Sequence, residues 1–195
     1  MRLLFSFIIL ILSLQSLTNA DEVGDFEIEG IAIGDSLLDY FEKKKINKFL
    51  NYDHLPSDMK FRISEIYQED FNMNVYDGIQ VFYKPKDKKF IIYSVSGLID
   101  CAKGNKNKCE SKFNKIGDDL KKVFKKIKPE TRSFPHFDDK TGKSIVKISS
   151  FDLIDGRITV SYTDWTKKMK FTDNVAVEVH TREVSNWINS NYGTN

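Results

Sequence analysis

The serine in the sequence Gly34-Asp35-Ser36-Leu37 is the residue of this chain best suited to covalent chemistry. A strand-like apolar run precedes it and a helical apolar pattern follows it, so Ser36 is predicted to lie on a strand-to-helix turn. A serine hydroxyl there can attack an ester carbonyl if a histidine takes its proton and nearby donors stabilise the oxyanion. His180 is the histidine that we would assign as this base.

These four residues resemble the motif of the GDSL lipase/esterase family, in which the serine is the nucleophile. The resemblance implies a serine esterase that uses Ser36. That family also has a Gly-x-Asn-Asp block and a C-terminal Asp-x-x-His, and this chain has neither, since Val177 stands three residues before His180. The other interpretation, which we favour, is structural: a glycine turn followed by Ser36 as a helix N-cap, with Asp39 completing a capping box.

The two cysteines, Cys101 and Cys109, are predicted to form a disulfide, because an exported chain with an even number of cysteines usually pairs them. A metal site is the alternative, but it would need further ligands, and no histidine stands near either cysteine. The histidines are His54, His136 and His180, and no two of them have helical spacing. The sequence therefore predicts no metal centre and no cofactor.

A loop at residues 164–170, with the sequence DWTKKMK, is the candidate binding surface. It lies between two predicted strands and combines a tryptophan and a methionine with basic residues. Because tryptophan often anchors interfaces, we assign Asp164, Trp165, Lys167 and Met169 to a site for an unknown protein or small-molecule partner. The alternative is a long hairpin loop whose Trp165 folds back onto the sheet.

Residues 1–20 have the pattern of a secretory signal peptide. Arg2 precedes an apolar stretch at 3–14, and the segment ends in Thr18-Asn19-Ala20, with small side chains at the two positions that a signal peptidase reads. The apolar stretch is shorter than the roughly 18 to 20 residues that cross a bilayer as a helix. We predict a periplasmic or extracellular protein with one domain over 21–195 and no stable membrane span after cleavage. The alternative is an uncleaved N-terminal anchor.

The charge balance argues against nucleic-acid binding. The chain has 30 basic and 28 acidic residues, a formal net charge of +2, and removal of Arg2 with the signal peptide lowers it by one. Proteins that bind nucleic acid usually carry a clear basic excess, because they must neutralise phosphates. We therefore expect no nucleic-acid partner.

Hydrophobic periodicity predicts an α+β fold with an antiparallel sheet and helices packed on one face. The order suggests two helix-plus-three-strand units, at 35–100 and 105–182. The predicted elements are a strand at 26–34, one or two short helices at 37–50, strands at 59–67, 78–83 and 89–98, a helix that follows Cys109 and ends at Pro129, a loop at 133–142, strands at 144–153, 157–163 and 174–182, and a helix at 183–192.

The element order resembles the architecture of beta-lactamase-inhibitor-like and BamE-like domains. The segments FEIEGIAIGDSLLDYF and SYTDW…TDNVAVEV also resemble uncharacterised exported proteins of marine bacteria, which implies export and no activity. Three functions follow as hypotheses: a non-enzymatic binding module, a serine hydrolase that uses Ser36, and an envelope structural or assembly factor. We favour the first, because the sequence contains no complete catalytic set.

Overall fold

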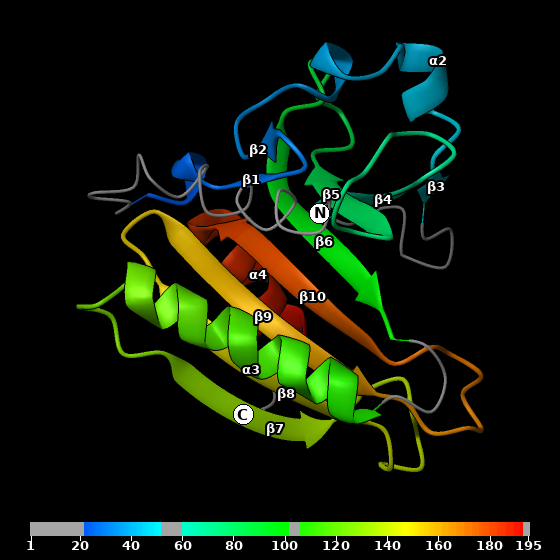
Figure 1. Ribbon diagram of the computed structural model, residues 1–195. Helices are drawn as coiled ribbons and strands as arrows, with labels where there is room; N and C mark the ends of the chain where they lie inside the picture. The colour runs from blue at the N-terminus through cyan, green and yellow to red at the C-terminus, as the bar shows by residue number, and fades with distance from the viewer. Residues whose placement is uncertain (1–21, 52–59, 102–105, 193–195) are drawn as a thin grey trace, which may run out of the picture.

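A large antiparallel sheet dominates the molecule (Figure 1). The structure is a computed structural model, and it describes residues 22–51, 60–101 and 106–192. The predicted signal peptide at 1–20 and His54 lie outside these residues. The combination of this sheet with separate helices confirms the predicted α+β class.

Eight strands form the sheet, in the order β3-β4-β5-β6-β10-β9-β8-β7. They are β3 (Leu50–Asn51), β4 (Arg62–Tyr67), β5 (Gly78–Tyr83), β6 (Ile92–Asp100), β7 (Glu130–Pro135), β8 (Ile145–Asp152), β9 (Gly156–Asp164) and β10 (Asn174–Thr181). Strands β3 to β6 form one meander and β7 to β10 form another. The meanders join where β6 pairs with β10, so these two strands are central and β3 and β7 are the edges.

The two edge strands differ from the prediction. Strand β7 includes residues that we expected in the loop at 133–142, because its sequence ETRSFP does not alternate between apolar and polar side chains and ends in Pro135. An edge strand tolerates both features, since one of its sides needs no ladder partner. Each predicted run of three strands is therefore extended by a fourth strand at its outer edge, β3 in the first run and β7 in the second. Whether the two runs are repeats of one unit stays a prediction.

Helix α3 (Lys106–Val123) covers one face of the sheet (Figure 1). Its Phe113 and Ile116 pack against Tyr162 of β9 and Val175 of β10. The main core continues on this face beneath the N-terminal segments. Its members from β5, β6 and β10 include Ile79, Val81, Val95, Val177 and Val179.

Helix α4 (Arg182–Tyr192) lies behind the sheet in Figure 1, whereas α3 lies in front. Val184 of α4 is fully buried against Phe61 and Phe82, and the Trp187 ring meets Phe61 edge-on at 5.6 Å between centroids. The expectation that the helices share one face is therefore wrong. The reason is that both faces of the sheet carry apolar side chains. On β5, Val81 belongs to the main core, whereas its neighbour Phe82 points to the other face and belongs to the cluster with Val184.

The predicted strand at 26–34 is instead a short hairpin. Strand β1 (Glu27–Ile28) pairs with β2 (Ile31–Ala32) across a turn in which Glu29 and Gly30 have φ values of 53° and 79°. Two successive residues with positive φ are typical of the tight turns that match the twist of paired strands. The apolar alternation continues through this turn, and for that reason it resembled a single strand.

The predicted helical stretch at 37–50 contains two short helices. They are the 3-10 helix η2 (Leu37–Asp39) and the α-helix α2 (Lys43–Ile46). A further 3-10 helix, η1 (Val23–Asp25), precedes β1. Within the described ranges, none of the helices has the length and apolar character needed to cross a membrane.

Cys101 and Cys109 form a disulfide, with 5.7 Å between their Cα atoms, as predicted. The bond joins the residue after β6 to the start of α3. That helix begins at Lys106, before Cys109 rather than after it, and ends before Phe124 rather than at Pro129. Cys109 is fully buried between the helix and the sheet.

Candidate functional site

Ser36 is the N-cap of η2. Its Oγ accepts a hydrogen bond from the Leu38 N–H at 3.1 Å and donates one to the Lys89 carbonyl oxygen at 2.5 Å. The Asp39 carboxylate accepts a hydrogen bond from the Ser36 N–H at 3.2 Å, which completes a capping box. The hydroxyl therefore both starts a helix and holds the loop between β5 and β6.

His180 bonds to residues other than Ser36. Its Nδ1 lies 2.6 Å from Ser94 Oγ, and its Nε2 lies 3.1 Å from Glu178 Oε2. Ser161 Oγ donates to the other Glu178 oxygen at 2.7 Å. Among the described residues, no hydrogen bond joins Ser36 to His180, and both have their polar atoms engaged elsewhere.

The chain of Ser94, His180 and Glu178 has the order of a nucleophile, a base and an acid, but it is buried. Ser94 is 0% exposed and His180 is 5% exposed, so a substrate carbonyl cannot reach the hydroxyl. Burial by itself would raise the pKa of Glu178, but the hydrogen bonds and charge of its partners outweigh burial and lower it. With Ser161, this network joins β6, β10 and β9 through polar side chains.

A row of four rings stands at one end of the sheet, and we call it the aromatic loop surface. Its members are His136 and Phe137, which follow β7, and Trp165 and Phe171, which follow β9. The centroids are 4.7 Å apart from Phe137 to His136, 4.1 Å from His136 to Trp165 and 4.8 Å from Trp165 to Phe171. Phe137 and Phe171 are 59% and 57% exposed. Burial lowers the pKa of His136, so this ring is neutral at physiological pH.

Asp139 ties the two loops of this surface together. Its buried carboxylate accepts hydrogen bonds from the backbone and side chain of Ser144, from those of Thr141, and from Thr166 Oγ1 at 3.2 Å. The bonds from Ser144 and Thr141 hold the pKa of Asp139 well below its usual range. The exposed rings therefore stand on a fixed polar support rather than on free loops.

The acidic side chains of these loops are largely turned inward. Asp139 is buried, Asp164 forms an ion pair with Lys106, and Asp173 accepts a hydrogen bond from the Trp165 N–H at 2.8 Å. The outward charges are mainly basic. The exposed charged residues of the two loops are Asp138, Lys140, Lys143, Lys167, Lys168 and Lys170.

The structure places the predicted binding residues in different settings. Trp165 is half-buried in the ring row, Lys167 is exposed and Met169 is half-buried. Asp164 pairs with Lys106, the first residue of α3. Sequence analysis missed the ring partners of Trp165, which are His136 and Phe171, and missed Phe137, which stacks on His136. One signal was present: each phenylalanine has polar residues directly after it in its loop, where a large apolar residue has no periodic pattern to satisfy.

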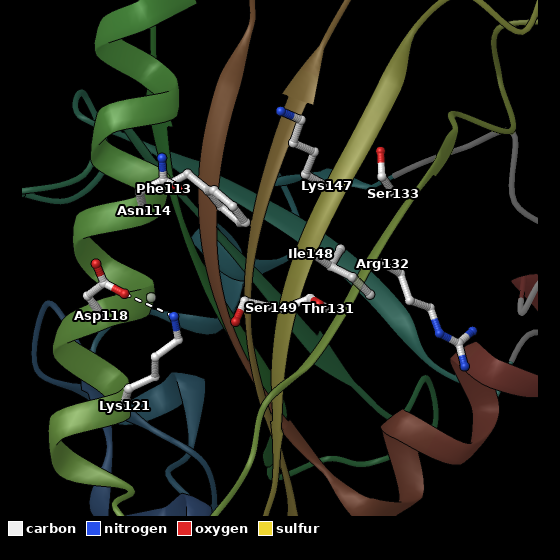
Figure 2. Close-up of a pocket in the computed structure, with 11 residues that line it drawn as sticks. Phe113, Asn114, Asp118, Lys121, Thr131, Arg132, Ser133, Lys147, Ile148 and Ser149 are labelled. Carbon is white, nitrogen blue, oxygen red and sulfur yellow. Dashed lines mark hydrogen bonds and ion pairs between the residues drawn. The ribbon is translucent and has the colours of Figure 1, made fainter.

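A groove of about 600 Å³ runs between α3 and the strands β7 and β8 (Figure 2). Small residues keep it open, and Ser149 and Gly117 face each other across its inner end. Ser149 Oγ and the Tyr162 hydroxyl beneath the helix are buried, and neither has a hydrogen-bond partner within the described ranges. The groove is lined by Phe113, Asn114, Gly117, Asp118, Lys121, Thr131, Arg132, Ser133, Lys147, Ile148 and Ser149.

The charged side chains of the groove form ion pairs along its rim. Lys121 pairs with Asp118 at 2.9 Å on the helix, and Lys147 reaches across to Glu110 at 2.5 Å. Burial raises the pKa of Tyr162 to about 12, so its hydroxyl remains protonated. In the part of the chain that the structure describes, no group of three or more histidine, cysteine or acidic side chains is arranged to hold a metal ion.

Comparison with known proteins gives no match to a family model, to a curated protein sequence or to a solved structure. A functional assignment for this chain therefore rests on its own residues and geometry.

Proposed function

We propose that this chain is an exported, non-enzymatic binding module that attaches to an anionic lipid surface of the cell envelope through the aromatic loop surface. The observation that carries the proposal is the exposure of Phe137 and Phe171 at the two ends of a ring row with a fixed polar support. Large apolar side chains that are exposed to solvent on loops of fixed conformation are typical of an interaction site.

The chemistry of the surroundings favours a lipid surface over a protein partner. Aromatic rings prefer the boundary between headgroups and acyl chains, where one side is apolar and the other is wet. Lysines next to an anionic membrane contribute about 1 kcal/mol each. The loops offer both, because their lysines face outward and Asp139, Asp164 and Asp173 are engaged within the protein.

Export is supported by the signal-peptide pattern at 1–20 and by the disulfide between Cys101 and Cys109, which is compatible with an oxidising compartment. A periplasmic or extracellular location places the protein next to membrane surfaces. The resemblance to exported proteins of marine bacteria implies the same location and stays a prediction, as does the resemblance to BamE-like architecture.

A non-enzymatic role is supported by the hydrogen bonds of the candidate catalytic residues, because these bonds engage their reactive atoms in structural contacts. The Ser36 hydroxyl is used in a helix cap and His180 in a buried network, so the alternative of a GDSL-type esterase gains nothing from the geometry. Ser94 does have a histidine partner, but it has no access to substrate.

The test is co-sedimentation of the mature protein, residues 21–195, with lipid vesicles. We expect binding to vesicles of phosphatidylcholine with phosphatidylglycerol, weaker binding to phosphatidylcholine alone, and weakening by salt. The double substitution Phe137→Ser and Phe171→Ser should reduce the partition coefficient at least about tenfold, because each ring loses part of the roughly 1.5–3 kcal/mol gained on full burial.

Ile154 offers a matched control. It is 87% exposed on the hairpin between β8 and β9, at the opposite end of the sheet, so Ile154→Ser should leave vesicle binding unchanged. The substitutions Lys167→Gln and Lys168→Gln should weaken binding to anionic vesicles only. Absence of binding to either vesicle, or equal loss in the Ile154 variant, would refute the lipid assignment.

A further inference from the structure

Helix α3 and the segment that follows it carry a concentrated positive charge. Residues 106–128 contain nine lysines and three acidic residues, which gives a net charge of +6, whereas the rest of the chain has 21 basic and 25 acidic residues. Figure 1 shows α3 in front of the sheet, and none of the described elements packs on its outer side. The positive charge of the protein is therefore gathered on one segment, which faces solvent.

Ion pairs within the protein neutralise only part of this charge. Asp118 and Asp119 pair with three lysines of the helix, and Lys106 has a partner on β9. Glu110 pairs with Lys147 of β8 and so neutralises no lysine of the segment. Among the described residues, five lysines of the segment form no ion pair, namely Lys108, Lys112, Lys125, Lys126 and Lys128.

Helical spacing lines up part of this charge in what we call the lysine row. The row consists of Lys108, Lys112, Lys115, Asp119 and Lys122. Its members follow one another at steps of three or four residues, so their side chains stand on one side of α3, away from the helix residues that line the groove. Three of its four lysines are exposed and Lys112 is half-buried. At 1.5 Å per residue the row extends over about 21 Å.

The row favours a long anion over a small one. Exposed ion pairs are individually weak and are screened by salt, so a single carboxylate or phosphate group gains little on such a surface. A polymer with anionic groups at regular intervals contacts several lysines at once, and after the first contact the others form at a high effective concentration. The ligand that suits the row is therefore an anionic chain.

The side chains around the row indicate which class of anionic chain fits. On its solvent side the row is bordered by Ser111 and Asp118. This surface offers no aromatic ring on which a nucleic-acid base could stack, and no apolar side chain that could anchor a protein or enter a lipid layer. Charged and hydroxyl groups alone suit a hydrophilic polysaccharide with sulfate or carboxylate groups, a class of ligand that lysine-rich segments bind.

We propose that the lysine row of α3 binds a linear anionic polysaccharide, which lies along the helix. The row runs along the face of the sheet, whereas the aromatic loop surface stands at one end of it, so the inference does not depend on lipid attachment (Figure 1). The unpaired lysines at 125–128 extend the positive charge beyond the end of the helix.

The experiment titrates dextran sulfate into the mature protein in a calorimeter, and neutral dextran is the matched control ligand. We expect binding to dextran sulfate that weakens as the salt concentration rises, and no binding to dextran. The triple variant Lys108→Gln, Lys112→Gln and Lys122→Gln removes charge from the row and leaves Asp119 paired with Lys115. It should weaken binding at least about tenfold and reduce the dependence on salt.

A second triple variant separates the row from the net charge of the protein. Lys43→Gln, Lys86→Gln and Lys88→Gln remove the same charge from three exposed lysines outside α3. We expect this control to bind dextran sulfate within about twofold of the wild type, because the attraction between exposed charges is screened over a distance of about 10 Å.

The variant used to test lipid attachment shows whether the two surfaces act separately. Phe137→Ser with Phe171→Ser should bind dextran sulfate as the wild type does, so a failure of the lipid assignment leaves this result intact. Absence of binding to dextran sulfate, equal loss in the two triple variants, or loss in the Phe137 and Phe171 variant would overturn the proposal. Tighter binding to a DNA duplex or to anionic vesicles than to dextran sulfate, with the same dependence on the row, would overturn the choice of a polysaccharide.

Discussion

At the residue scale, Ser36 makes contacts of the kind that stabilise a fold. Its Oγ accepts from Leu38 and donates to Lys89, so one hydroxyl joins a helix start to a loop of the sheet. We expect Ser36→Ala to lower the free energy of unfolding by about 1 kcal/mol, through loss of the cap and of one further hydrogen bond. Urea denaturation measures this change.

The same variant tests the esterase alternative. The mature protein should hydrolyse short-chain p-nitrophenyl esters no faster than buffer, and Ser36→Ala should not change that rate. Ser36→Thr, which keeps the capping hydroxyl, should recover most of the stability. Hydrolysis by the wild type that disappears in the alanine variant would contradict the structural role and identify Ser36 as a nucleophile.

Asp139 makes the support of the aromatic loop surface sensitive to acid. Hydrogen bonds from Ser144 and Thr141 lower its pKa in the folded state below the value of about 3.9 that an aspartate has in an unfolded chain. The folded state therefore binds this proton less readily. The stabilisation is fully present above the unfolded pKa and is lost as the pH falls through the folded pKa.

We therefore expect Asp139→Asn to lower the melting temperature at neutral pH and to flatten its decline below about pH 4. Circular dichroism melts over a pH series measure both effects. Thr141→Val, which removes one donor and keeps the carboxylate, should give a smaller shift in the same direction. A variant whose melting temperature runs parallel to that of the wild type over the whole series would show that Asp139 contributes nothing to the acid sensitivity.

At the scale of elements, the disulfide fixes α3 to the end of β6. The cysteines are 8 residues apart in sequence, and closing so short a loop stabilises by about 2.5 kcal/mol in the chain-entropy account. The double substitution Cys101→Ala and Cys109→Ala should lower the free energy of unfolding by at least this amount, because Cys109 is also buried. Urea denaturation of the variant measures the loss.

The reduced wild type is the control for this prediction. It keeps both sulfur atoms in the core and loses only the cross-link, so its stability should lie between those of the oxidised protein and the double variant. Equal stability of all three forms would mean that neither the bond nor the packing of the cysteines matters for α3.

At the scale of the whole molecule, the two meanders form one continuous sheet. Strands β6 and β10 pair from Ser94 to Asp100, and the main core draws Val95 from one meander and Val177 and Val179 from the other. We therefore expect a single cooperative unfolding transition, in which the calorimetric and van't Hoff enthalpies agree. Two separate transitions would instead support independent units at 35–100 and 105–182.

Local patterns in the sequence determined the elements whose formation depends on neighbours along the chain. Helical spacing predicted the body of α3, and alternation predicted most of β5, β6, β8, β9 and β10. The disulfide was predicted from an even number of cysteines in a chain with a predicted export signal. These features are decided by backbone preference and by the periodicity of apolar side chains.

Only the tertiary structure decided the ring partners of Trp165, the groove beside α3 and the placement of α4. Phe137 meets the row that contains Trp165 because β7 to β10 pair in sequence, which brings both loops to one end of the sheet. The groove exists because α3 leaves part of β8 and the edge strand β7 uncovered. Strand partners and the face that a helix covers depend on contacts between distant segments, and a local pattern of residues carries no record of them.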